Sequence, residues 1–98
     1  MGIDKSKTII IEFYNRTSTL TELWIEPSCI SVQLDSKTEY RVEIDDNEYR
    51  IEIDEQTLIL YLQFRFGPKV FKREFVDGHK NEKEWILAED YSDLNDLR

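Results

Sequence analysis

The side chains that could act as nucleophile or base are few. The sequence contains one cysteine, Cys29, and one histidine, His79. A cysteine nucleophile needs a base such as histidine within hydrogen-bond reach, so this pair requires a fold that brings the two residues together. A free cysteine is usually buried and a lone histidine in a loop is usually exposed. We therefore expect neither residue to be catalytic.

Carboxylates are abundant, because 21 of the 98 residues are Asp or Glu. A carboxyl group that acts as a general acid needs a raised pKa, which burial provides. Glu12 and Glu26 are the candidates, since each follows an apolar residue in a strongly apolar segment. For both residues we expect an outward-facing or hydrogen-bonded structural role instead. The sequence predicts no catalytic residue and no enzyme.

Metal and phosphate sites are also not indicated. Zinc sites need several Cys or His ligands, and this sequence has one of each. The acidic segment 45–48 resembles a loop of oxygen ligands, but it lacks the glycine and the distal glutamate of a calcium loop. No glycine-rich phosphate loop occurs. We therefore predict no metal site and no cofactor.

Around these groups, apolar and polar residues alternate with a period of two, which is typical of β-strands. The predicted strands cover residues 8–14, 20–26, 30–34, 39–44, 49–54, 58–66 and 70–76. Within them, Tyr49, Ile51 and Ile53 are expected on a buried face. The segment 58–66 is apolar on both faces and is expected to be a central strand. The connections 35–37 and 45–48 have the length and turn residues of hairpins.

The C-terminal residues have a different pattern. Asn81 with Glu84 three residues later resembles a capping box, and Trp85 follows among good helix formers. This predicts a short helix over 82–90, with an eighth strand as the alternative. An acidic tail follows.

These elements predict an all-β fold: a single antiparallel β-sandwich or small barrel of about seven short strands, with a short C-terminal helix or acidic tail. Residues 1–98 form one domain, with an N-terminal extension over 1–7, a β core over 8–76 and the helix or tail over 81–98. Residues 1–8 lack the apolar region of a signal peptide, and no apolar run approaches the roughly 18 residues of a membrane span. We therefore expect a cytoplasmic protein with no membrane partner, and a sequon at Asn15-Arg16-Thr17 that is not used.

The net charge of −8 is concentrated in one part of the chain. Residues 20–58 carry three basic and eleven acidic side chains. A negative surface attracts positively charged partners and repels the phosphates of nucleic acids. A solvated face that keeps the protein soluble explains the same acids. A smaller basic cluster beside phenylalanines could bind single-stranded nucleic acid, but the acidic balance argues against this; it comprises Arg65, Lys69, Lys72 and Arg73.

The segment Leu23-Trp24-Ile25-Glu26-Pro27 resembles a motif of small uncharacterised bacterial proteins. In those proteins a strand ending near an asparagine precedes the motif, and a strand like 40–43 and an Asp-Gly turn follow it. The resemblance covers about residues 9–78 and departs after Pro27, at Ser28-Cys29. It implies a small β-sandwich and no activity. In size, acidity and lack of catalytic groups, the chain is also similar to bacterial toxin-immunity proteins, which mask the active site of a toxin.

Two functional hypotheses follow. In the first, the domain is an immunity or inhibitor protein whose acidic face masks a basic, nuclease-like toxin. The residues expected to bind this partner are seven acids and two aromatic anchors: Glu39, Glu43, Asp45, Asp46, Glu48, Glu52, Asp54, Trp24 and Tyr49. In the second, the domain has a structural or assembly role and adds strands or forms a homodimer through an open sheet edge. The edge is expected at 70–76 or at the strand before Pro27.

Overall fold

The computed structural model describes residues 7–46, 48–63, 67–77 and 80–91, and in these ranges all regular structure is β-strand. There are eight strands, and their bounds are as follows: β1 (Lys7–Asn15), β2 (Glu22–Glu26), β3 (Ile30–Gln33), β4 (Thr38–Asp46), β5 (Tyr49–Asp54), β6 (Thr57–Leu62), β7 (Lys69–Glu74) and β8 (Ile86–Asp90). The all-β prediction is confirmed. The helix predicted over 82–90 is wrong, because Ile86–Asp90 pairs with β7 as a strand.

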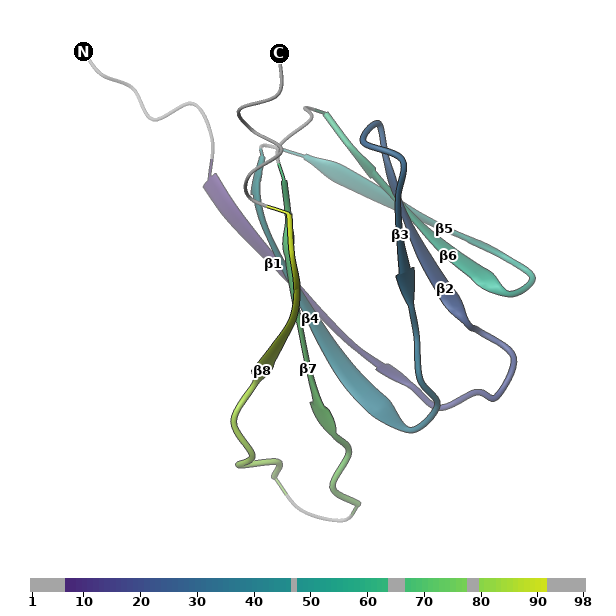
Figure 1. Ribbon diagram of the computed structural model, residues 1–98, viewed down its shortest axis with the longest axis vertical. Coiled ribbons are helices and arrows are strands. Elements are labelled where there is room, and N and C mark those ends of the chain that lie inside the picture. Colours follow the sequence, from purple (N-terminus) through teal and green to yellow (C-terminus); the bar gives the residue numbers. More distant parts are fainter. Residues whose placement is uncertain (1–6, 47, 64–66, 78–79, 92–98) are drawn as a thin grey trace.

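The strands form two four-stranded sheets (Figure 1). Sheet A has the order β1-β4-β7-β8 and sheet B has the order β3-β2-β6-β5, so the strands do not close into a barrel. Pairing is antiparallel except between β2 and β6, which run parallel. The expectation of a purely antiparallel fold is therefore wrong at one pair. Local alternation does not reveal it, because the pattern of a strand is the same in either direction.

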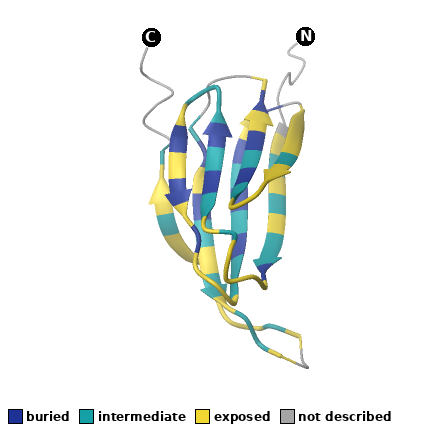
Figure 2. Ribbon diagram, turned by 90° about the vertical axis from the view of Figure 1, so that its right-hand side faces the viewer, coloured by how far each residue is buried: buried dark blue, intermediate teal, exposed yellow. Residues whose placement is uncertain are grey.

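The core lies between the two sheets, in a sandwich-like arrangement. It consists of inward-facing apolar residues from both sheets: Leu23, Ile25, Ile30, Val32, Leu34, Tyr40, Val42, Ile44, Leu58, Leu60, Leu62 and Val70. Figure 2 shows the alternation of buried and exposed positions along the strands of sheet B. Burial of one face of each sheet is the driving force for this arrangement, and it explains the period of two in the sequence.

The two connections that were expected to be hairpins instead carry the chain from one sheet to the other. β3 belongs to sheet B and β4 to sheet A, so residues 34–37 cross between the layers. After β4 the chain returns to sheet B, where β5 begins. Turn chemistry predicts where a strand ends, but it does not determine which sheet the next strand joins. The hairpins are β2–β3 and β5–β6, and β8 returns alongside β7 after a longer connection.

Asn15, at the end of β1, organises the first crossing. Its side chain is 2 % exposed. Nδ2 donates to the carbonyls of Leu20 at 2.9 Å and Asp35 at 3.0 Å. Oδ1 accepts the backbone N–H of Thr17 at 3.1 Å and the hydroxyl of the same residue at 2.8 Å. The sequon asparagine is therefore a buried structural residue, because its amide is fully used in hydrogen bonds.

The edge strands differ from those that we expected. β7 lies between β4 and β8, and β2 lies between β3 and β6, so both of the proposed edges are internal. The edges of the described sheets are β1, β8, β3 and β5. β6 is internal, as expected of its apolar sequence, although it ends at Leu62. The end of the predicted strand, residues 64–66, lies outside the described residues.

Candidate functional site

Trp24 lies on the outward surface of sheet B. Its neighbours Leu23 and Ile25 point into the core, so alternation places Glu22, Trp24 and Glu26 on the opposite side of β2. The indole N–H of Trp24 donates to Oε2 of Glu26 at 2.6 Å. This hydrogen bond fixes the ring beside a carboxylate on a surface that Figure 2 views directly. The Glu26 carboxylate is thus an outward-facing hydrogen-bond acceptor.

The strands beside β2 extend this surface with more carboxylates and a second aromatic ring. Tyr61 of β6 is 38 % exposed and lies opposite Glu26 in the strand register. Its hydroxyl donates to Oε1 of Glu52, on β5, at 3.4 Å. The negative charge of Glu52, with some burial, raises the pKa of Tyr61 above its ordinary value. The ring therefore stays neutral in a negatively charged environment.

We name this outward surface of sheet B the acidic face and define it by six residues: Glu22, Trp24, Glu26, Glu52, Asp54 and Tyr61. Among the described strand residues on it, Arg50 is the only cationic side chain, and it pairs with Glu52 at 2.6 Å. Glu22 accepts hydroxyl hydrogen bonds from Ser31 at 2.6 Å and from Thr57 at 3.3 Å. Negative charge is therefore in excess on this face, and hydrogen bonds from neutral hydroxyl groups fix the position of the Glu22 carboxylate.

Three acids on the outward surface of sheet A are in a different state, because arginines of the same sheet pair with them. Glu39 accepts from Nε of Arg73 at 2.8 Å, and both side chains are only 17 % exposed. Arg41 pairs with Glu43 at 2.9 Å and with Glu12 at 3.2 Å. The Glu12 carboxylate, a candidate general acid in the sequence, is thus a cross-strand ion-pair partner that faces outward.

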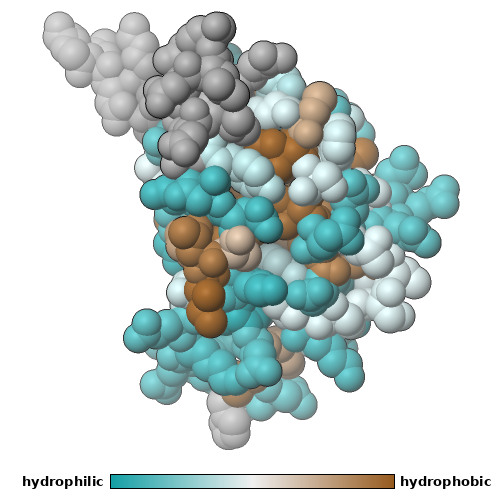
Figure 3. Space-filling view, in the orientation of Figure 1, coloured by the Kyte–Doolittle hydropathy of each residue, from teal (hydrophilic) through white to brown (hydrophobic). Residues whose placement is uncertain are grey.

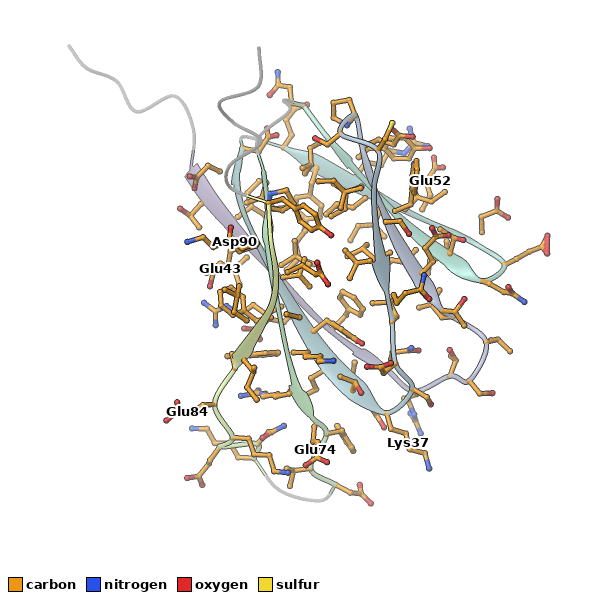
Figure 4. All side chains as sticks on the ribbon, viewed as in Figure 1. Lys37, Glu43, Glu52, Glu74, Glu84 and Asp90 are labelled. Atoms are coloured by element: carbon orange, nitrogen blue, oxygen red, sulfur yellow. The ribbon has the colours of Figure 1, made fainter. Side chains whose placement is uncertain are left out.

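The nine residues predicted to bind a partner do not form one surface. Figure 4 shows Glu43 and Glu52 on opposite sides of the molecule. Those that share the acidic face are Trp24, Glu52 and Asp54, whereas Glu39, Glu43 and Asp45 face outward from sheet A. Asp46 is completely buried, and Glu48 is an exposed connection residue. Tyr49 lies on the inward side of β5.

Residues that the sequence did not select complete the acidic face: Glu22, Glu26 as a surface charge, and Tyr61. Alternation along β2 would have placed Glu22 and Glu26 beside Trp24. Nothing in the sequence indicates that Tyr61 is a neighbour, because that contact depends on the parallel pairing of β2 with β6. Such non-local pairings are set by the packing of the whole sheet rather than by local pattern.

Cys29 is exposed, contrary to the expectation that it is buried. It lies in the β2–β3 turn with a φ of 58°, and this turn places the thiol outside the core. Its Sγ is 3.6 Å from Oε1 of Glu26. The other sequence candidate, His79, lies outside the described residues. Within the described ranges, no cluster of three or more His, Cys, Asp or Glu side chains is arranged to hold a metal ion.

A groove of about 590 Å³ opens between the edge strands β3 and β8, and apolar surface reaches the exterior on this side of the molecule (Figure 3). Tyr40 lines its floor, and the Tyr40 hydroxyl accepts the backbone N–H of Asp35 at 2.6 Å. Lys72 and Asp35, also in the groove, pair at 3.3 Å. Burial raises the pKa of Tyr40, because an ionised phenolate would lose its hydration. Asp35 is thus engaged with both Tyr40 and Lys72 in the groove.

The described ranges include no helix with the length and hydropathy required for a membrane crossing. Comparison of the chain with protein-family models, with curated proteins and with solved structures finds no match.

Proposed function

We propose that this chain is a protein-binding module without catalytic activity, and that it binds a basic protein through the acidic face of sheet B. The observation that carries the proposal is the difference between the two outward surfaces. On sheet A, Glu39 and Glu43 are paired with arginines of the same sheet. On sheet B, carboxylates are in excess around two partly exposed aromatic rings. Unpaired charge of one sign favours a partner of the opposite sign.

The side-chain chemistry of the acidic face suits arginine in particular. A guanidinium group can bind a carboxylate through two hydrogen bonds and stack on an aromatic ring at the same time. Sheet A contains this combination within the chain: Arg73 pairs with Glu39 at 2.8 Å and lies 4.1 Å from the ring centre of Trp85. On the acidic face, Trp24 beside Glu26 offers a ring and a carboxylate, and no arginine among the described residues pairs with them. An arginine of the partner could take that place.

We further propose that the partner is a nuclease-like toxin domain, which the module would inhibit as an immunity protein. A surface that binds nucleic-acid phosphates is rich in Lys and Arg. An acidic sheet surface would bind to such a site and block the access of substrate. The proposal thus combines the acidic face with the similarity in size and charge to toxin-immunity proteins.

The test is a capture experiment with matched variants. Purified domain is immobilised, exposed to an extract of the source cells at low salt and eluted with salt. We expect a basic protein to be captured by the native domain and lost in the variant Glu22→Gln/Glu52→Gln/Asp54→Asn. The control variant Asp45→Asn/Glu82→Gln/Glu84→Gln removes the same charge elsewhere and should capture it normally. Equal capture by both variants would contradict the role of the acidic face.

The immunity proposal has its own readout. The nuclease activity of the captured protein is measured with increasing amounts of the domain. We expect inhibition to be complete at one domain per nuclease, because a masked active site cannot bind and cleave its substrate. A captured protein that retains its nuclease activity would leave the acidic face as a binding surface and would rule out inhibition.

A further inference from the structure

β5 is an edge strand whose apolar side is not covered. Tyr49, Ile51 and Ile53 share the inward side of sheet B with the buried leucines of β6, their partners in the strand register. They are nevertheless 49 %, 40 % and 73 % exposed, respectively. The sequence pattern gave the correct side of the strand, but sheet A does not cover this edge. The strand thus combines an apolar row with backbone groups that no described strand pairs on its outer edge.

The order of residues along β5 is complementary to itself. When two copies of the strand are placed antiparallel with Ile51 opposite Ile51, Tyr49 of each copy lies opposite Ile53 of the other. In the same alignment Arg50 lies opposite Glu52 in both directions. Every one of these cross-strand pairs joins apolar to apolar or opposite charges, and such pairs stabilise antiparallel sheets.

From this complementarity we propose that two copies of this chain form a dimer by antiparallel pairing of their β5 strands, about a two-fold axis at Ile51. The occupant of the open edge is thus a second copy of the same strand. A two-fold axis requires a surface that is complementary to itself, and the β5 sequence meets that condition. The pairing joins the two B sheets into one continuous sheet and lets the exposed apolar rows cover each other.

Neighbouring registers are less favourable. Residues opposite one another in an antiparallel pair share a face of the sheet. The alignment can therefore shift only to registers that keep the apolar residues of both strands on the same face. One such step places Arg50 opposite Arg50, and the other places Glu52 opposite Glu52. Like charges directly opposite are destabilising. The Ile51 register places Glu48 opposite Asp54, but this pair lies at the ends of the ladder, where water and salt screen it.

Within each chain Arg50 already pairs with Glu52 at 2.6 Å. In the dimer, each arginine gains the Glu52 of the second copy across the strand, so four charges of alternating sign form a square on the outward surface. The ion pairs within each strand and those between the two strands would then both stabilise the dimer. This arrangement does not depend on the proposed toxin partner.

Sedimentation velocity tests the dimer and its register together. We expect the native chain to form a concentration-dependent dimer, and Arg50→Glu and Glu52→Arg each to weaken it by at least about tenfold. The double variant Arg50→Glu/Glu52→Arg restores opposite charges and should recover native affinity to within about threefold. A native chain that stays monomeric up to about 1 mM would overturn the proposal. So would a double variant no better than the single ones.

Cross-linking provides a second test, in a Cys29→Ser background. The Cα atoms of residues directly opposite in an antiparallel pair are about 4.5–5.5 Å apart, within the range for a disulfide. Ile51→Cys should therefore form a disulfide-linked dimer under mild oxidation. Ile53→Cys is the matched control, because its Cα atoms would be roughly 13 Å apart along the paired strands. Equal cross-linking of the two variants would overturn the register.

Discussion

Oδ2 of Asp46 accepts the backbone N–H of Gln63 at 3.1 Å, and so joins the end of β4 in sheet A to the chain just after β6 in sheet B. Oδ1 lies 3.5 Å from the backbone nitrogen of Glu48. The side chain is completely buried. This carboxylate, which the sequence suggested as a contact for a partner, thus holds the two sheets together at one end of the molecule.

Asp46→Ala should destabilise the fold strongly. It leaves the backbone N–H of Gln63 without its acceptor and removes a buried side chain, and loss of a hydrogen bond to a charged group costs about 1.5–3 kcal/mol. The free energy of unfolding is measured by urea denaturation. Asp45→Ala is the control, since that neighbour is exposed and its bond to Thr8 is at the surface; we expect it to cost less than about 1 kcal/mol. Equal effects would contradict the role given to Asp46.

Tyr40→Phe should lower the free energy of unfolding at neutral pH. It should also make that free energy fall less steeply as the pH rises above 10. The Tyr40 hydroxyl accepts the N–H of Asp35 at 2.6 Å, and its removal should cost about 1–2 kcal/mol. The pKa of Tyr40 is raised above its ordinary 10.0, so its protonated form stabilises the fold fully below pH 10. That contribution is lost as the pH rises through the raised pKa.

The measurement for Tyr40 is unfolding free energy as a function of pH. The native protein should lose stability more steeply above pH 10 than Tyr40→Phe, whose remaining slope comes from other groups such as Tyr91. Tyr61→Phe is the control at neutral pH, because its hydroxyl is exposed and its loss should leave the unfolding free energy nearly unchanged. Parallel pH curves for the native protein and Tyr40→Phe would contradict the argument.

Trp24→Leu should weaken binding of the captured basic protein more than it weakens the fold. An aromatic anchor at the centre of an interface contributes about 2 kcal/mol or more, which corresponds to roughly thirtyfold in Kd. Calorimetric titration of the purified partner measures this effect. Trp85→Leu, at the only other tryptophan, is the matched control; this ring contacts Arg73 of sheet A, and its loss should leave Kd unchanged. A Kd that responds to Trp85 and not to Trp24 would place the interface on the other sheet.

Most strands were predictable because one of their faces is buried, and burial imposes a period of two on the sequence. In four of the seven predicted ranges the described residues of the inward apolar face are core residues, as in Tyr40, Val42 and Ile44 of β4. The helix prediction failed at Ile86–Asp90 because a capping pattern and helix formers describe only local preference. Pairing with β7 outweighs that preference.

The acidic face was predictable only in part. Alternation places Trp24 opposite the core, and charge counting identifies residues 20–58 as the acidic region. Charge counting does not show that Arg73 neutralises Glu39, since those residues meet only through the β4–β7 register. Equally, the burial of Asp46 depends on the crossing between the sheets. The sequence therefore indicated that the surface charge is negative, but not which acidic residues form the acidic face.

The crossings between the sheets also determine how the chain must assemble. Lys7 is paired with Asp46, so β1 has no partner until the chain has passed through two strands of the other sheet. Closing such long loops costs conformational entropy before the strand pairs that offset this cost have formed. Folds with many such non-local pairs form in milliseconds to seconds rather than microseconds. The short hairpins β2–β3 and β5–β6 can form earlier, and the parallel β2–β6 contact must then join them. Sheet B can thus form as a unit from residues 22–62, whereas sheet A is complete only when β8 has joined.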